Sequence, residues 1–281
     1  IYYHDRWYGN TTLTRESAKD QSSNKTKMKK HSGKGTITYD NGDVYDGTFQ
    51  NAEPHGIGKM TYNDGRVCEG IWKNGKIEYE GELVDEKPHG KGKKIYSSGC
   101  VYEGDWKNGL RHGQGTLKWQ NASYEGEWKD DKIQGKGTFT GTDGSSYEGE
   151  FKDGKKHGKG IYKYADGSVM YDGEWKEDRL HGYGTYNYKN GDVYTGQWSA
   201  ADMHGEGVMT YANQDVYDGE WKEGCKDGKG KMKYRNGDVY TGEFSEDKMH
   251  GKGVFEYAAG DLSKSIGEWK EGEKCGFFED F

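Results

Sequence analysis

Residues 240–257 read YTGEFSEDKMHGKGVFEY, and they place three glycines, a cluster of charged residues and four aromatic residues side by side. Such a mixture is common in flexible linkers, yet disordered segments are poor in aromatic residues. The whole chain shares this bias, because its 281 residues include 47 Gly and only 30% hydrophobic residues, but also 23 Tyr, 9 Trp and 8 Phe. Its apolar surface is concentrated in rings, so the sequence predicts a packed structure.

The stretch is one copy of a repeat. Tyr-x-Gly recurs mostly every 22 to 24 residues, with degenerate copies at 68–70 and 265–267. The intact copies begin at Tyr45, Tyr79, Tyr102, Tyr124, Tyr147, Tyr171, Tyr194, Tyr217 and Tyr240. A Gly-x-Gly column runs in phase with them. We therefore predict a single repeat array over residues 31–281, preceded by a non-repeat segment, residues 1–30.

Within a repeat the residues alternate with a period of two. Tyr171, Gly173 and Trp175 would share one side of an extended strand, with the acidic residues between them on the other side. Asn-Gly and Asp-Gly dipeptides such as Asn190-Gly191 lie between repeats and favour tight hairpin turns. No stretch has helical periodicity. The predicted fold is all-β: an elongated, solenoid-like, single-layer antiparallel meander of about ten hairpins.

The alternation of glycine and aromatic residues suggests how such a layer packs. A glycine leaves a slot in which a neighbouring ring can lie flat. On the opposite face, the acidic residues of one strand are expected to pair with lysines of the next strand. The acidic column contains Glu127, Glu150, Glu174, Glu220 and Glu243. Its regular recurrence favours surface ion pairs over general-acid catalysis.

Residues 102–119, YEGDWKNGLRHGQGTLKW, resemble the MORN repeat (membrane occupation and recognition nexus). The resemblance covers about nine-tenths of the chain. It implies a twisted single-layer sheet of hairpins that acts as a scaffold or interaction module. Similar repeats occur in radial-spoke head proteins, parasite cytoskeletal scaffolds and junctophilins. They also extend plant phosphatidylinositol-phosphate kinases and some histone-lysine methyltransferases, whose catalytic domains nothing in this chain resembles.

No catalytic residue, cofactor or metal site is predicted. Seven histidines share one position of the repeat, but equivalent residues two strands apart are about 9.5 Å apart, too far to bind one zinc ion. They are His55, His89, His112, His157, His181, His204 and His250. A histidine that hydrogen-bonds locally near a turn is the simpler interpretation. The Gly-x-Gly pairs lack the third glycine and the helix of a dinucleotide-binding loop.

Charge and cysteine content narrow the location and the partners. The net charge of −7 gives no reason to expect nucleic acid. Four cysteines lie far apart without a CxxC pair, which favours a reducing compartment. The resemblance to MORN-repeat proteins further implies a cytoplasmic protein of the cytoskeleton or of a cilium, flagellum or axoneme. Since the chain begins with Ile1 rather than Met, a segment removed before it is left open.

Two functions are considered for the array. The first is a non-enzymatic scaffold that holds a partner protein along an aromatic groove. The second is a peripheral membrane module that binds phosphoinositide headgroups, which is less favoured because no Arg-rich pocket is evident. The predicted groove is lined by Tyr102, Trp106, Trp119, Tyr124, Trp128, Tyr147, Tyr171, Trp175, Tyr194, Trp198, Tyr217 and Trp221.

The two ends depart from the repeat. The aromatic stretch at residues 1–10, which contains Trp7 and Tyr8, either caps the first edge of the sheet or inserts into a partner. The polar, lysine-containing residues 11–30 are interpreted as a linker. At the other end Phe277, Phe278 and Phe281 crowd onto a terminus with little chain left to bury them. We predict a terminal interface there, most simply a two-fold homodimer, with a foreign cap or a frayed tail as alternatives.

Overall fold

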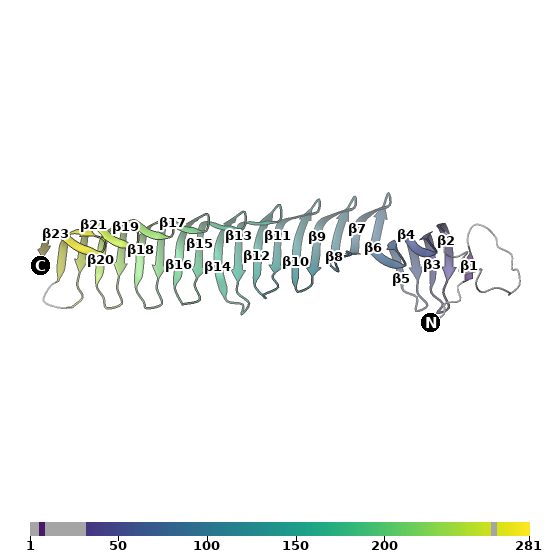
Figure 1. Ribbon diagram of the computed structural model, residues 1–281, viewed down its shortest axis with the longest axis horizontal. Helices are drawn as coiled ribbons and strands as arrows, with labels where there is room; N and C mark the ends of the chain where they lie inside the picture. The colour runs from purple at the N-terminus through teal and green to yellow at the C-terminus, as the bar shows by residue number, and fades with distance from the viewer. Residues whose placement is uncertain (1–5, 9–31, 260–262) are drawn as a thin grey trace. The chain divides into compact units, whose positions relative to one another are not determined.

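The computed structural model describes residues 6–8, 32–259 and 263–281, with the backbone alone for residues 6–8 and for Phe277. Its contacts divide the chain into two units, Ile1–Lys132 and Ile133–Phe281. The described residues contain no helix, and so none that could span a membrane. Each unit is an open antiparallel meander in which consecutive strands pair (Figure 1), and the all-β prediction is confirmed.

The strands of the first unit are β1 (Arg6–Tyr8), β2 (Gly33–Thr38), β3 (Val44–Gln50), β4 (Glu53–Thr61), β5 (Val67–Lys73), β6 (Lys76–Val84), β7 (Lys87–Ile95), β8 (Val101–Lys107), β9 (Leu110–Trp119) and β10 (Ala122–Lys129). The backbone of β1 pairs antiparallel with β2, with Trp7 opposite Ile37 and Tyr8 opposite Thr36. This pairing is the arrangement expected of an edge cap.

The second unit continues the same pattern. Its strands are β11 (Lys132–Thr140), β12 (Ser146–Lys152), β13 (Lys155–Lys163), β14 (Val169–Lys176), β15 (Arg179–Asn187), β16 (Val193–Ser199), β17 (Asp202–Thr210), β18 (Val216–Lys222), β19 (Cys225–Lys233), β20 (Val239–Ser245), β21 (Lys248–Glu256), β22 (Lys264–Lys270) and β23 (Glu273–Asp280).

Two kinds of turn alternate along the meander. Two-residue turns such as Glu177-Asp178 have positive φ at both positions, 50° and 68°. The loops that contain the Asn-Gly dipeptides are longer than the sequence suggested. In the loop before β16 only Gly191 has positive φ, 95°, while the Asn190 side chain accepts a hydrogen bond from the Asp192 amide, 3.1 Å. This is a three-residue loop, a type I turn followed by a left-handed glycine.

Each second strand of a repeat bulges at its Gly-x-Gly. Between β14 and β15 the register passes from Gly173 opposite Gly184 to Glu174 opposite His181, so Gly182 and Tyr183 are inserted. Gly182 has φ +59°, and a Cβ there would lie 2.5 Å from Oε2 of Glu174. The β15–β16 pairing has no such shift. The bulge is therefore one-sided and bends the strand.

The recurring acidic residue fills this bulge. The Tyr183 amide donates to Oε1 of Glu174 at 3.3 Å, and the Lys229 amide donates to Glu220 at 3.0 Å. A lysine partner of the expected kind is found for Asp105, which lies 2.6 Å from Lys91 Nζ. Backbone capping is therefore a role of this column that the expectation of lysine pairing missed.

Aromatic rings pack on the glycines as predicted. The Tyr171 ring covers both Gly173 and Gly184, and its hydroxyl donates to the Glu174 carbonyl at 3.1 Å. Trp175 Nε1 donates to the carbonyl of Gly160 at 3.0 Å. Tyr171 meets the rings of Trp175 at 5.2 Å and of the next repeat's Trp198 at 5.8 Å, both edge to face. Each tyrosine therefore links two repeats.

One repeat is only half as long as the others, and it turns the aromatic face over. Cys68 is followed after 11 residues by Tyr79, so β5 pairs directly with β6 and no Gly-x-Gly strand lies between them. Trp72 is opposite Ile77, but Ile71, on the other face of β5, is opposite Tyr79. The register shift between these two pairs places Tyr79 on the face away from Trp72.

Burial on the two sides agrees with this inversion. Trp72 belongs to a buried cluster with Tyr45 and Phe49, against which Ile77 packs. Tyr79 lies 5.4 Å from the ring of Trp106. Burial, with the nearby Glu80 carboxylate, raises the pKa of Cys68 to about 11, as expected if Glu80 shares the face of Cys68. From Tyr79 onward in this unit, the aromatic residues occupy the opposite side of the sheet.

In the last hairpin the ring that packs on a glycine comes from the second strand instead of the first. Ser265 stands where other repeats have the tyrosine, and Phe278 stands where they have the second glycine of Gly-x-Gly. The Phe278 ring covers Gly267 and meets Trp269 edge to face at 5.5 Å. Phe278 is therefore half-buried in the place of the missing tyrosine ring. The expectation that this ring lacks burial is wrong.

Candidate functional site

The predicted groove residues form the core of the sheet. The six tyrosines of that set are 0% exposed and five of its tryptophans are 4–5% exposed. Each of these rings is covered by its neighbours. The alternating pattern in the sequence predicted the face on which they lie but not that they are buried. The prediction that they line an accessible groove is wrong for these eleven residues. Trp119 alone among the twelve is half-buried.

A second set of rings on the same face remains partly open. In the second unit they directly follow the Gly-x-Gly strands, at the start of the loop to the next strand, and all are half-buried. We call them the aromatic row: Tyr164, Tyr188, Tyr211, Tyr234 and Tyr257. The sequence signal was the tyrosine that precedes most Asn-Gly and Asp-Gly dipeptides. The sequence alone did not assign a role to any of them.

Further rings lie beside the row and broaden it. Tyr186 meets Tyr188 at 4.5 Å, and Phe255 meets Tyr257 at 4.7 Å. Tyr234 stacks on Phe255 with centroids 6.0 Å apart and planes 29° apart. Burial raises the pKa of Tyr186 to about 12.

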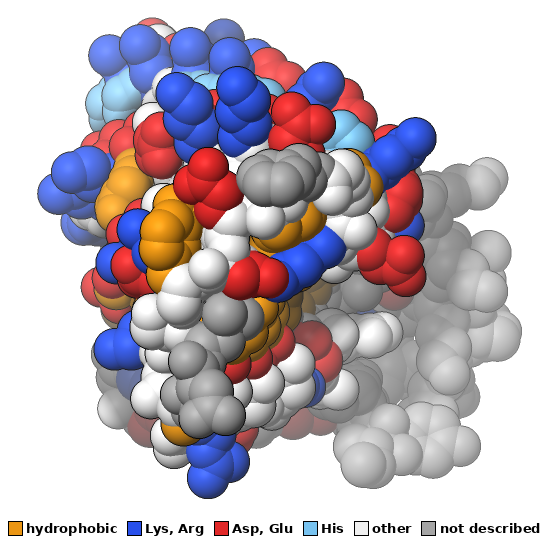
Figure 2. Space-filling view, turned by 90° about the vertical axis from the view of Figure 1, so that its left-hand side faces the viewer, with side chains coloured by type: hydrophobic (Ala, Val, Ile, Leu, Met, Phe, Trp, Pro, Cys, Tyr) orange, Lys and Arg blue, Asp and Glu red, His pale blue; other side chains and the backbone are white. Residues whose placement is uncertain are grey.

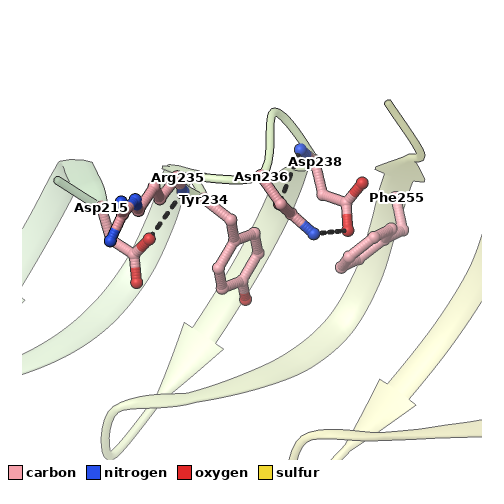
Figure 3. A pocket seen from close by; sticks show the side chains of 6 residues that line it. All are labelled: Asp215, Tyr234, Arg235, Asn236, Asp238 and Phe255. Carbon is pink, nitrogen blue, oxygen red and sulfur yellow. Dashed lines mark hydrogen bonds between the residues drawn. The ribbon is translucent and has the colours of Figure 1, made fainter. Parts of the chain in front are cut away.

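A shallow pocket of about 540 Å³ interrupts the row (Figure 3). The rings of Tyr234 and Phe255 form its wall, and Asp215 and Asp238 lie at its rim. Both carboxylates are held in place, because Asp215 accepts the Arg235 amide at 2.7 Å and Asp238 accepts the Asn236 side-chain amide at 2.7 Å. Aromatic walls beside fixed carboxylates suit a cationic side chain.

Cations of the chain already lie over several rings of this face, including one of the row. Lys156 Nζ lies 4.7 Å from the ring centroids of both Tyr162 and Trp175, and Lys189 Nζ lies 4.7 Å from that of Tyr164. Burial lowers the pKa of Lys156, and the negative charge of Asp178 partly offsets this decrease. In the first unit the Arg111 guanidinium lies 4.3 Å from Trp128.

The second unit, which carries the row, contains charged residues of both signs and has a net negative charge. Residues 133–281 contain 28 Asp and Glu against 20 Lys and Arg. The space-filling view from the side of β23 shows hydrophobic side chains in the middle of the stack, with His near many Lys and Arg side chains along one border (Figure 2). The long-range field of the second unit therefore favours a basic ligand.

The histidine column does not assemble a metal site in the described part of the chain, which contains no group of three or more His, Cys, Asp or Glu side chains that could hold an ion. The His181 backbone carbonyl instead accepts a long hydrogen bond from the Tyr171 hydroxyl, 3.4 Å. His112 Nδ1 lies 3.4 Å from the Asp130 carboxylate. The first contact lies within one repeat, and the second joins two neighbouring repeats.

Of the predicted terminal interface, the side chains of Trp7, Tyr8 and Phe277 lie outside the described residues. Phe278 is packed as described above. Phe281 is 60% exposed, while its backbone exchanges hydrogen bonds with Lys264 and its carbonyl accepts the Ser263 amide at 2.7 Å. Phe281 thus has a hydrogen-bonded backbone and an exposed ring.

The family model for the MORN repeat matches twelve stretches of the chain: 27–44, 45–65, 68–78, 79–101, 102–123, 124–146, 147–169, 171–193, 194–216, 217–239, 240–262 and 266–277. The third match, 11 residues long, is the half-repeat. No curated protein matches the chain.

Solved structures similar to this chain include two peptide-bound domains and a lyase. The TCP10 domain of Danio rerio CPAP, in complex with a STIL peptide, is 11% identical over 75% of this chain and 90% of that one, with a TM-score of 0.35. The TCP domain of Drosophila melanogaster SAS-4, in complex with a proline-rich motif of Ana2, is 11% identical over 90% and 97%, with a TM-score of 0.22. Virginiamycin B lyase from Staphylococcus aureus is 11% identical over 100% and 88%, with a TM-score of 0.14. Similarities this low do not indicate a function.

Proposed function

This chain belongs to the MORN-repeat family, and we propose that it is a non-enzymatic scaffold that binds an extended segment of a partner protein along the aromatic row. The observation that carries the proposal is the row itself: five half-buried tyrosines on one face of the second unit, one in each of five repeats. Cations of the same chain already lie over such rings. The partner segment is therefore proposed to carry Lys or Arg side chains.

The spacing of the row specifies the conformation of that segment. Equivalent tyrosines two strands apart are about 9.5 Å apart, at 4.7–4.9 Å per strand. A polyproline II helix rises about 3.1 Å per residue with three residues per turn, so every third side chain recurs after about 9.3 Å on one side. A segment in this conformation with a basic residue at every third position matches the row ring for ring.

A labelled 12-residue peptide, Lys-Pro-Pro repeated four times, tests the proposal by fluorescence anisotropy. We expect it to bind the full chain more tightly than a peptide of the same composition with its four lysines in one block, because only the first places one lysine at each ring. The double variant Tyr188→Ala, Tyr211→Ala should lose about tenfold in affinity, or about 1.4 kcal/mol.

The matched control is Thr185→Ala, Thr195→Ala on the opposite face, where these two hydroxyl groups lie 3.0 Å apart. It should bind as the unmodified chain does. Equal affinity for the two peptides, together with no effect of the tyrosine double variant, would refute the proposed site.

The setting of the scaffold is proposed from the family resemblance: a cytoskeletal or ciliary, flagellar or axonemal assembly in the cytoplasm. Imaging of a tagged chain in ciliated cells tests it. The net negative charge of the second unit disfavours the membrane alternative, because phosphoinositide headgroups are also negatively charged. Co-sedimentation with vesicles that contain phosphatidylinositol 4,5-bisphosphate, lost on removal of residues 1–30, would support that alternative instead.

We also propose a homodimer through the C-terminal hairpin, supported by the exposed ring of Phe281. At micromolar concentration the full chain is expected to sediment as a dimer, and the variant Phe281→Ser and a version ending at Lys270 as monomers. If the full chain is itself a monomer, the homodimer is excluded, which leaves a foreign cap or a frayed tail.

A further inference from the structure

The half-repeat gives the first unit two aromatic faces on opposite sides of its sheet. On the first side, β2 to β5 carry half-buried Tyr39 and Tyr62, which stand where the tyrosines of the aromatic row stand in the second unit. On the other side, β7 and β9 lead to half-buried Tyr96 and Trp119 in the same position of the repeat. The junction of β5 and β6, where the side changes, can be followed in Figure 1.

The two faces offer the same chemistry. On the first side the Arg66 guanidinium lies 4.8 Å from the Tyr62 ring and is anchored to Asp64 at 2.8 Å. On the second side Lys94 Nζ lies 5.3 Å from the Tyr96 ring. Each face thus places a partly open ring beside a cation of the chain.

Carboxylates also border the rings of the first side. Asp43 accepts the Asn63 amide at 2.9 Å, so it is held in the neighbouring loop just as Asp215 is held beside the pocket of the second unit. Rings next to fixed carboxylates select a basic group. The chemistry that favours a basic segment on the aromatic row is therefore repeated on the first side of this unit.

We propose that the face of β2 to β5 is a separate docking site for a second basic, polyproline II-like protein segment, so that one chain holds two such segments on opposite sides of the first unit's sheet. The chemistry of the partner rests on the proposed function; the separation into two sites rests on the register shift at the half-repeat. Tyr39 and Tyr62, one repeat apart, would take two lysines three residues apart.

The first experiment counts bound segments. The Lys-Pro-Pro peptide is fused to a folded carrier protein, and complexes with the full chain are sized by sedimentation velocity. The double variant Tyr39→Ala, Tyr62→Ala is expected to bind one carrier fewer than the unmodified chain. Tyr96→Ala, Trp119→Ala should also lose one carrier, and the two losses should add because the sites are independent.

Tyr39 and Tyr62 also pack on the buried cluster, so a second variant protects the test from simple unfolding. Tyr62→Leu keeps an apolar side chain but removes the aromatic face, and it should weaken only the first site. An unchanged number of bound carriers in both variants would overturn the proposed site on the face of β2 to β5. If the carrier binds no form of the chain, the proposed function fails instead, so the two failures are distinguishable.

The second experiment tests the inversion itself. Replacing Lys76–Glu78 with a copy of Leu110–Ser123 restores the missing strand and loop, which brings both faces to one side. A tandem probe, with two Lys-Pro-Pro runs joined by a linker too short to pass around the sheet, should bind this variant at least tenfold more tightly than the natural chain. Equal affinities would show that the faces already share one side.

Discussion

Replacing Gly184 with alanine is expected to destabilise the second unit by about 3 kcal/mol or more, because the new Cβ would lie 2.5 Å from Cζ of the buried Tyr171 ring. The ring has nowhere to move, since Trp175 and Trp198 meet it on both sides. Urea unfolding followed by circular dichroism measures the loss. Hydrogen exchange should locate it at β14 to β16.

Gly154→Ala is the matched control. Gly154 has φ +82°, but a Cβ added there would meet nothing within 4 Å, and Ala201 already adopts φ 82° at the equivalent turn. This change should cost only about 1 kcal/mol. Similar losses for the two variants would mean that backbone strain, rather than the space filled by the ring, explains the glycine column.

Alkaline pH should unfold the array over a narrow range. Burial raises the pKa of all nine core tyrosines above the ordinary value of 10, to about 12 for Tyr79 and Tyr240. The others are Tyr45, Tyr102, Tyr124, Tyr147, Tyr171, Tyr194 and Tyr217. Because the folded state favours the neutral phenol, this contribution is complete below pH 10. It falls by about 1.4 kcal/mol per pH unit for each tyrosine as the pH rises above 10.

The expected observation is a joint transition between pH 10 and 12, in which absorbance at 295 nm rises as the circular dichroism of the sheet is lost. Tyr171→Phe provides an internal check, because it removes the hydrogen bond to Glu174 at a cost of about 1 kcal/mol at neutral pH. Its disadvantage should shrink and then reverse above pH 10. Tyrosine ionisation centred at pH 10 without loss of structure would contradict this account.

The strands and the packing of rings on glycines could be predicted because both follow from local spacing. Tyr171, Gly173 and Trp175 alternate with exposed residues, and a period of two assigns each of them to a face without knowledge of the rest of the fold. The loops were predicted only in part. The dipeptide identified the glycine with positive φ, but it also suggested positive φ at Asn190, which the three-residue loop does not have. Loop length depends on the pairing of the flanking strands, which the dipeptide alone does not specify.

The depth of the rings was not predictable in the same way. Tyr164 and Tyr171 share a face and a residue type, yet one is half-buried and the other fully buried. Part of the difference comes from the neighbouring repeat, because Tyr171 is enclosed by its Trp198 as well as by Trp175, Gly173 and Gly184 of the same repeat. A pattern within one repeat carries no information on what the next repeat covers. The candidate site is therefore the aromatic row and not the buried tyrosines.

The half-repeat at Cys68 to Tyr79 has a consequence for how such chains can lengthen. A tandem duplication of about 23 residues adds one hairpin and leaves every ring on its original side. A replication slip of about half that length adds or removes one strand and turns over everything that follows it, while each strand keeps a neighbour to pair with. Both changes preserve a foldable sheet, but only the second alters which side of the protein later partners must approach. Insertions or deletions of whole repeats therefore keep later aromatic faces on the same side of the sheet, whereas those of a half-repeat move them to the other side.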